Sequence, residues 1–264
     1  EMVFSVVPSH TVREVLGGAA HLIPEGAPIV SCSKGIENET LLTVSELLED
    51  VLPLRCHPYL AYLSGPSFAQ EVVQCMPTAV VVASHGEKLG KMVQHAITAP
   101  YFRVYTSTDV IGVELGGALK NVLAIAVGAA IGFGLGDNTR AGMITRGLNE
   151  ITRLAMKRGA NPLTMMGLSG MGDLVLTCSG PLSRNRSVGE RLGQGEKIAD
   201  ILADMNMVAE GVKTALSVYN LAKKYQVEMP LSEQVYYVLY EDKPVGKAIE
   251  SLLSRLQKRE YEFF

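Results

Sequence analysis

Residues 108–140 decide the fold of this chain, and they read TDVIGVELGGALKNVLAIAVGAAIGFGLGDNTR. Most of the run is Val, Ala, Leu, Ile and Gly, which predicts a helix buried on most sides over Asp109–Gly132. Lys120 stands inside this run with Asn121 beside it. Burying an ammonium group is costly unless it is paired or its pKa falls, and either condition suits a catalytic lysine. The alternative is a lysine whose stem packs while its ammonium group reaches water.

Upstream of this helix, short β-like runs alternate with helical stretches. Strands are expected at Val3–Val7, Pro28–Cys32, Leu60–Leu63, Thr78–Ala83 and Phe102–Tyr105. Helices are expected near Thr11–Ala20 and Leu41–Val51. The alternation predicts a Rossmann-like α/β fold with a partial, doubly wound and largely parallel sheet. Ligands of such sheets sit at the carboxyl ends of the strands, so we expect a site at Lys34, Gly65 and Ser67, which follow strand ends.

Downstream of residue 107 the strand signals fade and helical patterns take over. An amphipathic helix is expected over Arg140–Arg158, before the stop signal Gly159-Ala160-Asn161-Pro162. Shorter helices are expected at Leu163–Leu168, Asp173–Cys178, Val188–Gly193, Ile198–Asn206, Lys213–Lys224, Ser232–Tyr240 and Val245–Ser254. We therefore expect a partial dinucleotide-binding domain over residues 1–107 and a helical substrate and catalytic domain over residues 108–264.

Composition limits the possible functions. A net charge of -3 argues against a nucleic-acid surface as the main function. The four cysteines are scattered without metal-ligand spacing, which favours reduced thiols and no metal site. The apolar stretch Asn121–Gly136 is short and rich in glycine, so a buried helix is favoured over a membrane span. The chain opens on Glu1 and enters a strand at once, from which we expect upstream sequence to be missing.

A polar segment, GLSGMGDLVLTCSGPLSRNRSVG at Gly167–Gly189, surrounds Asp173 with glycines and hydroxyl groups. Ser183 is a good helix cap, and Arg184 behind it can hold a phosphate through two parallel hydrogen bonds. The alternative is a polar surface loop before an ordinary helix. Taken with Lys34 and Lys120, these groups suit a small anionic carbonyl substrate.

Several motifs resemble the NAD(P)-dependent glycerol-3-phosphate dehydrogenase family, of the bacterial and plastid type. They are SKGIE at Ser33–Glu37, SGPSFAQEV at Ser64–Val72, GGALKNVLAIAVG at Gly116–Gly128, GLGDNTRA at Gly134–Ala141, GMGDLVLTCSGPLSRNR at Gly170–Arg186 and VAEG at Val208–Gly211. The resemblance implies a helical domain like that of 6-phosphogluconate dehydrogenase. It also implies NAD(P)H-dependent interconversion of dihydroxyacetone phosphate and sn-glycerol 3-phosphate, a step that supplies phospholipid precursors.

The resemblance also implies roles for single residues. Lys120 would take the proton from the C2 hydroxyl of glycerol 3-phosphate, or return it in reduction. Asp173 would contact substrate and set Lys120, and Lys34 would lie near both substrate and nicotinamide as a third catalytic residue. The implied substrate-binding residues are Lys34, Gly65, Ser67, Lys120, Asn121, Asp173, Thr177, Ser183, Arg184 and Asn185. The implied cofactor-binding residues are Lys34, Ala69, Arg184, Val208 and Glu210.

The chain departs from the family in one respect. The family carries a GxGxxG turn after its first strand, and this sequence has none. Two alternatives therefore stay open: an inactive fragment that acts only as a helical dimerisation or binding domain, and another dehydrogenase that joins a Rossmann domain to a helical one. We further expect NAD or NADP as cofactor, a homodimer, no nucleic-acid or membrane partner, and a cytoplasmic or plastid-stromal location.

Overall fold

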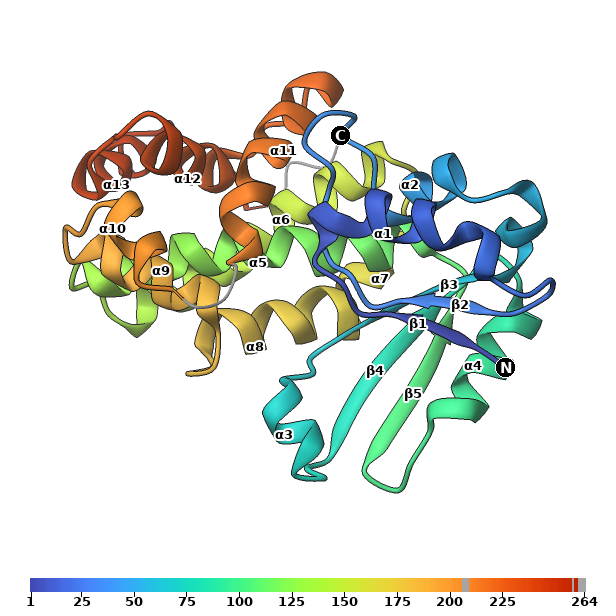
Figure 1. Cartoon of the computed structure of the whole chain (residues 1–264). Coiled ribbons are helices and arrows are strands. Elements are labelled where there is room, and N and C mark those ends of the chain that lie inside the picture. Colours follow the sequence, from blue (N-terminus) through green and yellow to red (C-terminus); the bar gives the residue numbers. More distant parts are fainter. Residues whose placement is uncertain (206–208, 258, 261–264) are drawn as a thin grey trace.

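The computed structural model describes residues 1–205, 209–257 and 259–260. A sheet flanked by helices occupies the first part of the chain, and helices alone make up the rest (Figure 1). The long helix α5, Val110–Gly132, runs through the middle of the helical part. The Rossmann-like sheet followed by an all-helical part is therefore confirmed.

The sheet contains five strands in the order β1-β2-β3-β4-β5. Their bounds are Val3–Ser5 for β1, Ile29–Ser31 for β2, Leu60–Ser64 for β3, Thr78–Ala83 for β4 and Phe102–Ser107 for β5. The pairs β1–β2, β2–β3 and β4–β5 are parallel, as predicted, but β3–β4 is antiparallel. Between β3 and β4 lies only α3, Ala69–Val73. The 13 residues between the two strands are near the lower limit of a crossover between parallel strands, which usually contains a longer helix.

Both faces of the sheet are covered by helices. Their bounds are Val12–Ala19 for α1, Val44–Val51 for α2 and Glu87–Ile97 for α4. Leu16 of α1 and Leu48 of α2 pack with Ile29 in one apolar cluster, whereas Val93 of α4 packs with Val30 in another. Ile29 and Val30 are adjacent in β2, so this strand is apolar on both faces. Sequence analysis missed α3 and α4.

Helix α5 is the core of the helical part. It is long and apolar enough to cross a membrane by composition, but 94% of its most apolar window is buried inside the protein. Asp109 caps its first turn by accepting a hydrogen bond from the Gly112 amide at 3.0 Å. The buried helix predicted over Asp109–Gly132 is confirmed, together with the burial of Lys120.

The remaining helices surround α5. Their bounds are Asp137–Lys157 for α6, Pro162–Met165 for α7, Asp173–Ser179 for α8, Arg184–Gly193 for α9, Ile198–Ala203 for α10, Glu210–Tyr225 for α11, Pro230–Tyr240 for α12 and Val245–Leu253 for α13. The helix expected over Leu163–Leu168 is present as α7 but ends earlier, at Met165, and a π-helical turn follows over Leu168–Gly172. Two helices begin earlier than predicted, α9 at Arg184 and α11 at Glu210.

Glycines let α9 lie directly against α5. A Cβ atom added at Gly128 of α5 would collide with the Arg186 carbonyl of α9. One added at Gly189 of α9 would collide with the Ile125 carbonyl of α5. Only glycine at these positions allows the two backbones to touch. This contact brings the start of α9, with Asn185, next to Asn121 on α5.

Candidate active site

Two lysines and one aspartate meet between the sheet and the helical part. Lys120 on α5 forms an ion pair with one carboxylate oxygen of Asp173, the first residue of α8. Lys34, in the loop after β2, places its Nζ 2.7 Å from the other carboxylate oxygen. The same Nζ donates a hydrogen bond to the Gly65 carbonyl at 3.1 Å. The Asp173 side chain is only 1% exposed, so both lysines share one buried carboxylate.

The π-helical turn before α8 positions Asp173. The backbone of this turn passes so close to α5 that a Cβ atom at Gly116 of α5 would lie 2.6 Å from the Ser169 carbonyl oxygen. One turn into α8, the Thr177 hydroxyl donates to the Asp173 carbonyl at 2.6 Å and lies 3.4 Å from its carboxylate. Thr177 is buried, and it contacts Asp173 from the next turn of the same helix. Local packing therefore holds the carboxylate in one orientation.

Burial and charge together change the proton affinities of this cluster. Burial, with a further contribution from Lys34, lowers the pKa of Lys120 to about 8, although Asp173 opposes the change. Burial alone would raise the pKa of Asp173, but Lys34 and Lys120 outweigh it and lower that pKa. Burial raises the pKa of the neighbouring Cys178 thiol to about 12, so this thiol is neutral near pH 8. Lys120 can therefore exchange a proton near neutral pH while Asp173 stays charged.

Residues after β3 form one wall of the cluster. Gly65 has a φ of 126°, which favours glycine, and a Cβ atom there would lie 3.0 Å from the Val80 Cα atom. The Gly65 carbonyl accepts a second hydrogen bond from the Ser67 hydroxyl at 3.1 Å. Ala69 begins α3 and is exposed. Gly65, Ser67 and Ala69 thus follow the strand end, as expected.

A second polar group lies at the start of α9. Ser183 caps the helix as predicted, its hydroxyl oxygen accepting a hydrogen bond from the Arg186 amide at 3.3 Å. Arg184 is exposed, whereas Asn185 is buried. The Asn185 amide donates to the Asn121 side chain at 3.0 Å and accepts from the Gly211 backbone at 2.9 Å. Asn185 therefore joins α5, α9 and α11, a structural contact that sequence analysis missed.

The last predicted residues lie at the start of α11. The Glu210 carboxylate accepts a hydrogen bond from the Ser9 backbone amide at 3.2 Å, and Ser9 begins a 3-10 helical turn shortly after β1. Glu210 thus faces the carboxyl end of the sheet across the junction with the helical part. Val208 lies outside the described residues.

Gly117 is a further residue of the site that was not predicted from the sequence. A Cβ atom there would lie 2.7 Å from the Ser64 hydroxyl oxygen and 3.5 Å from the Lys34 side-chain stem. The adjacent glycines Gly116 and Gly117, one turn before Lys120, were the available signal, because paired glycines in a helix indicate close approach of neighbouring groups.

The carboxyl ends of three strands bring polar groups together at one end of the sheet. The carboxyl ends of β1, β2 and β3 lead to Ser9, Lys34 and Gly65, at the edge where open α/β sheets bind ligands. Ser64, at the end of β3, has a buried hydroxyl without a hydrogen-bond partner among the described residues. A polar group left in this way suits a ligand contact. The 264 residues contain no GxGxxG turn for the pyrophosphate.

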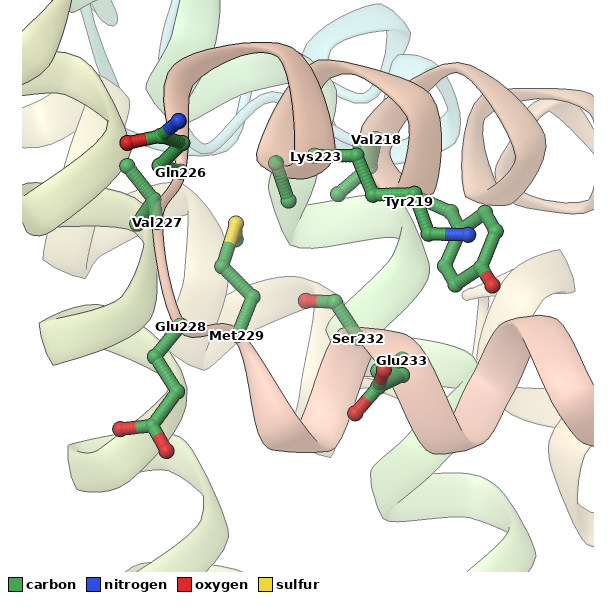
Figure 2. A pocket seen from close by; sticks show the side chains of 10 residues that line it. Val218, Tyr219, Lys223, Gln226, Val227, Glu228, Met229, Ser232 and Glu233 are labelled. Carbon is green, nitrogen blue, oxygen red and sulfur yellow. The ribbon is translucent and has the colours of Figure 1, made fainter.

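Two hollows of about 270 Å³ each lie elsewhere in the helical part. One is lined mostly by apolar side chains of α5, α6, α12 and α13. The other lies between α11 and α12, where Tyr219 and Lys223 line it from one helix and Ser232 and Glu233 from the other (Figure 2). Neither hollow is lined by Lys34, Lys120 or Asp173.

Comparison with known proteins relates both parts of the chain to one family. Residues 1–90 match the family model for the NAD-dependent glycerol-3-phosphate dehydrogenase N-terminus, and residues 109–250 match the one for its C-terminus. The chain is 58% identical over 260 residues to glycerol-3-phosphate dehydrogenase (NAD(P)+) of Myxococcus xanthus strain DK1622, covering 98% of this chain and 78% of that protein.

Two further relatives agree with this relationship. The protein of the same name from Leptospira biflexa is 56% identical over 260 residues, with the match covering 98% of this chain and 78% of the relative. A crystal structure of glycerol-3-phosphate dehydrogenase from Coxiella burnetii superposes with a TM-score of 0.89 at 39% identity. That superposition covers 96% of this chain and 76% of the crystallised chain.

Proposed function

The chain belongs to the NAD-dependent glycerol-3-phosphate dehydrogenase family, and we propose that Lys120, Asp173 and Lys34 are its catalytic residues. The protein is an NAD(P)-dependent oxidoreductase that interconverts sn-glycerol 3-phosphate and dihydroxyacetone phosphate. The observation that carries the catalytic assignment is the buried Asp173 carboxylate shared by two lysines. We assign residues 1–107 to the cofactor domain and residues 108–264 to the substrate domain.

Lys120 performs the proton transfer. In oxidation its neutral amine takes the proton of the C2 hydroxyl. When bound, the nicotinamide would accept the hydride from C2 in oxidation and would supply it in reduction. In reduction the Lys120 ammonium stabilises negative charge on the carbonyl oxygen and returns the proton. A pKa lowered to about 8 suits both directions, because acid–base groups work best near the ambient pH.

Lys34 and Asp173 orient this chemistry. Each oxygen of the Asp173 carboxylate accepts from the Nζ atom of one lysine, which keeps Lys120 in place to exchange a proton with the oxygen on C2. Lys34 reaches the same place from the sheet, which supports a contact with both substrate and nicotinamide. Substrate contacts are further assigned to Gly65, Ser67, Asn121, Thr177 and Asn185.

The start of α9 holds the substrate phosphate. The N-terminal end of a helix attracts anions, and the exposed Arg184 guanidinium at the start of α9 can reach one. The bond between Asn185 and Asn121 keeps this anion site at a set distance from Lys120. Cofactor contacts are assigned to Lys34, Ala69, Arg184, Val208 and Glu210.

Replacing Lys120 tests the catalytic assignment. Lys120→Ala should lower turnover by about a hundred- to ten-thousand-fold in both directions, the usual contribution of a positioned acid–base group. Lys88→Ala is the matched control, since Lys88 is an exposed lysine on α4. Near-normal turnover in a folded Lys120→Ala protein would make the lysine structural.

A homodimer formed through the helical part is also proposed. Leu253 and Leu256 are 80% and 88% exposed, and burying such side chains favours association. Light scattering of the purified protein tests this, and a single monomeric mass at all concentrations would reject it. A cytoplasmic location is proposed on the strength of the bacterial relatives, and cell fractionation tests it.

A further inference from the structure

The loop that carries Lys34 leaves the sheet and ends inside the helical part. Ile36, two residues after Lys34, is 6% exposed and belongs to the apolar cluster of the helical part, together with Ala118 and Val218. Leu41 packs against the same cluster. By contrast, Ile29 at the start of β2 belongs to a cluster within the sheet part. Lys34 therefore stands on a loop that bridges the two parts of the molecule.

Helix α11 holds this loop by polar contacts. Ser217 is fully buried, and its hydroxyl donates a hydrogen bond to the Ile36 carbonyl at 3.0 Å. The Asn38 side-chain oxygen is a second acceptor for the same Ser217 hydroxyl proton. One turn earlier, Thr214 is 2% exposed, and its hydroxyl oxygen would lie 3.9 Å from a Cβ atom at Gly35. Gly35 and Ile36, the two residues after Lys34, thus lie against one helix.

The segment that follows β1 holds the other side of the loop. The Ser33 hydroxyl, directly before Lys34, donates to the Val7 carbonyl at 2.6 Å. Lys34 is therefore fixed between a bond from Ser33 to this segment and a bond from α11 to Ile36. A lysine side chain has many rotamers, so its backbone must be held for Nζ to stay on one partner.

We propose that Ser217 is a positioning residue, whose hydroxyl holds the Ile36 carbonyl on α11 and thereby keeps Lys34 Nζ on Asp173 and Gly65. This inference rests on the proposed catalytic role of Lys34. Loss of the hydroxyl leaves a buried carbonyl without that partner, and the loop shifts to find another. Small displacements of a reacting group lower turnover strongly, because catalysis depends on near-contact geometry.

The first test does not depend on catalysis. Lysines are acylated with a limiting amount of an N-hydroxysuccinimide ester, and modification of Lys34 is followed by peptide mass spectrometry. Ser217→Ala should raise the rate of Lys34 acylation several-fold, because the Lys34–Asp173 ion pair opens more often. Ser232→Ala is the matched control. Ser232 is another buried serine, on α12, and its hydroxyl donates to the Glu150 carboxylate of α6 at 3.0 Å. Equal rates of Lys34 acylation in Ser217→Ala, Ser232→Ala and the unchanged protein would overturn the proposal.

The second test uses the pH dependence of turnover. The charged groups that act on Lys120 are Lys34, Asp173 and Glu210, and Lys34 lowers the pKa of Lys120. Ser217→Ala should therefore move the inflection of the turnover–pH curve above pH 8 and should lower the turnover itself. Ser232→Ala should change neither the inflection nor the turnover. An unchanged inflection and unchanged turnover in Ser217→Ala would count against Ser217. If Ser217→Ala does not fold, Ser217→Cys keeps the volume with a weaker donor and takes both measurements.

The two tests separate this inference from the proposed function. Faster acylation of Lys34 in Ser217→Ala, with normal turnover in Lys120→Ala, would support the loop contact and reject the catalytic assignment. Normal acylation in Ser217→Ala, with the expected loss in Lys120→Ala, would support the catalytic assignment and reject Ser217 as a positioning residue.

Discussion

Asp173 is the residue on which the charge balance of the site depends. Two ammonium groups this close repel each other, and the buried carboxylate between them offsets that repulsion. Removing one partner of a buried pair typically costs about 3–5 kcal/mol, because a buried charge is left uncompensated. The same arrangement leaves Lys120 easier to deprotonate than an ordinary lysine, since its burial outweighs the attraction of Asp173.

The lowered pKa of Lys120 predicts opposite pH dependences for the two directions. Oxidation needs the neutral amine, so its turnover should rise as pH increases through about 8. Reduction needs the ammonium form, so its turnover should fall over the same interval. Steady-state rates measured in each direction between pH 6 and 10 check this, the range being about two units on either side of the pKa. Turnover that rises with pH in both directions would show that another group titrates.

Arg184 should act on substrate affinity. Arg184→Ala should raise the KM for glycerol 3-phosphate about ten- to a hundred-fold, the effect of losing charge-assisted hydrogen bonds to a phosphate. Arg191→Ala is the control, because Arg191 lies at the other end of α9 and pairs with Glu196 and Asp204. Thermal protection by glycerol 3-phosphate should fall in Arg184→Ala alone. Equal protection of both variants would remove Arg184 from the phosphate site.

At the scale of elements, α5 is the scaffold of the site. Lys120 and its neighbour Asn121 point to different partners, the first to α8 and the second to α9. Successive residues of a helix point in directions about 100° apart, so α5 can contact α8 through Lys120 and α9 through Asn121 at the same time. The glycines of α5 and α9 then set how close α9 comes. The distance between the phosphate site and the lysine therefore depends on backbone contact.

Filling this helix contact should destabilise the protein. Gly189→Ala places a methyl group against the Ile125 carbonyl of α5, and overpacking of this kind costs about 1–3 kcal/mol. Gly142→Ala in α6 is the control, since a Cβ atom there has nothing within 4 Å. That change should be neutral or stabilise by up to about 1 kcal/mol, as alanine favours helix. Urea denaturation compares the two, and equal free energies of unfolding would contradict the close contact.

At the scale of the whole molecule, two glutamates join separate elements. Glu114 of α5 accepts a hydrogen bond from the Ser45 amide at 2.8 Å, at the start of α2. Glu150 of α6 accepts from the Leu231 and Ser232 amides at 2.7 and 3.1 Å, at the start of α12. Burial raises the pKa of each carboxyl to about 7, against the opposing effect of these hydrogen bonds.

These raised pKa values predict how stability changes with pH. A carboxyl whose pKa is raised on folding binds more protons in the folded state, so its contribution is fully present below pH 4.5 and is lost as pH rises through 7. Each group can change the free energy of unfolding by at most about 1.4 kcal/mol per pH unit. Glu150→Gln should flatten the dependence between pH 4.5 and 7. Chemical denaturation at several pH values measures this, and an unchanged slope would mean that Glu150 does not titrate there.

The sequence by itself determined the elements whose signals are local. The apolar run of α5 predicted a buried helix, and β-rich runs predicted all five strands, because periodicity and side-chain type act over a few neighbouring residues. The Ser183 cap was predictable for the same reason, since its hydroxyl bonds an amide three residues away. Motifs identified the family and its candidate residues.

Only the tertiary structure decided how those residues meet. Lys34 and Asp173 lie 139 residues apart, and Lys120 and Asp173 lie 53 apart, so no local pattern could reveal their shared contact. The antiparallel β3–β4 pair and the link from Asn185 to Asn121 and Gly211 likewise come from packing. The physical reason is that a lowered pKa or a buried hydrogen bond depends on which distant groups exclude water around it, and that is settled when helices and sheet pack together.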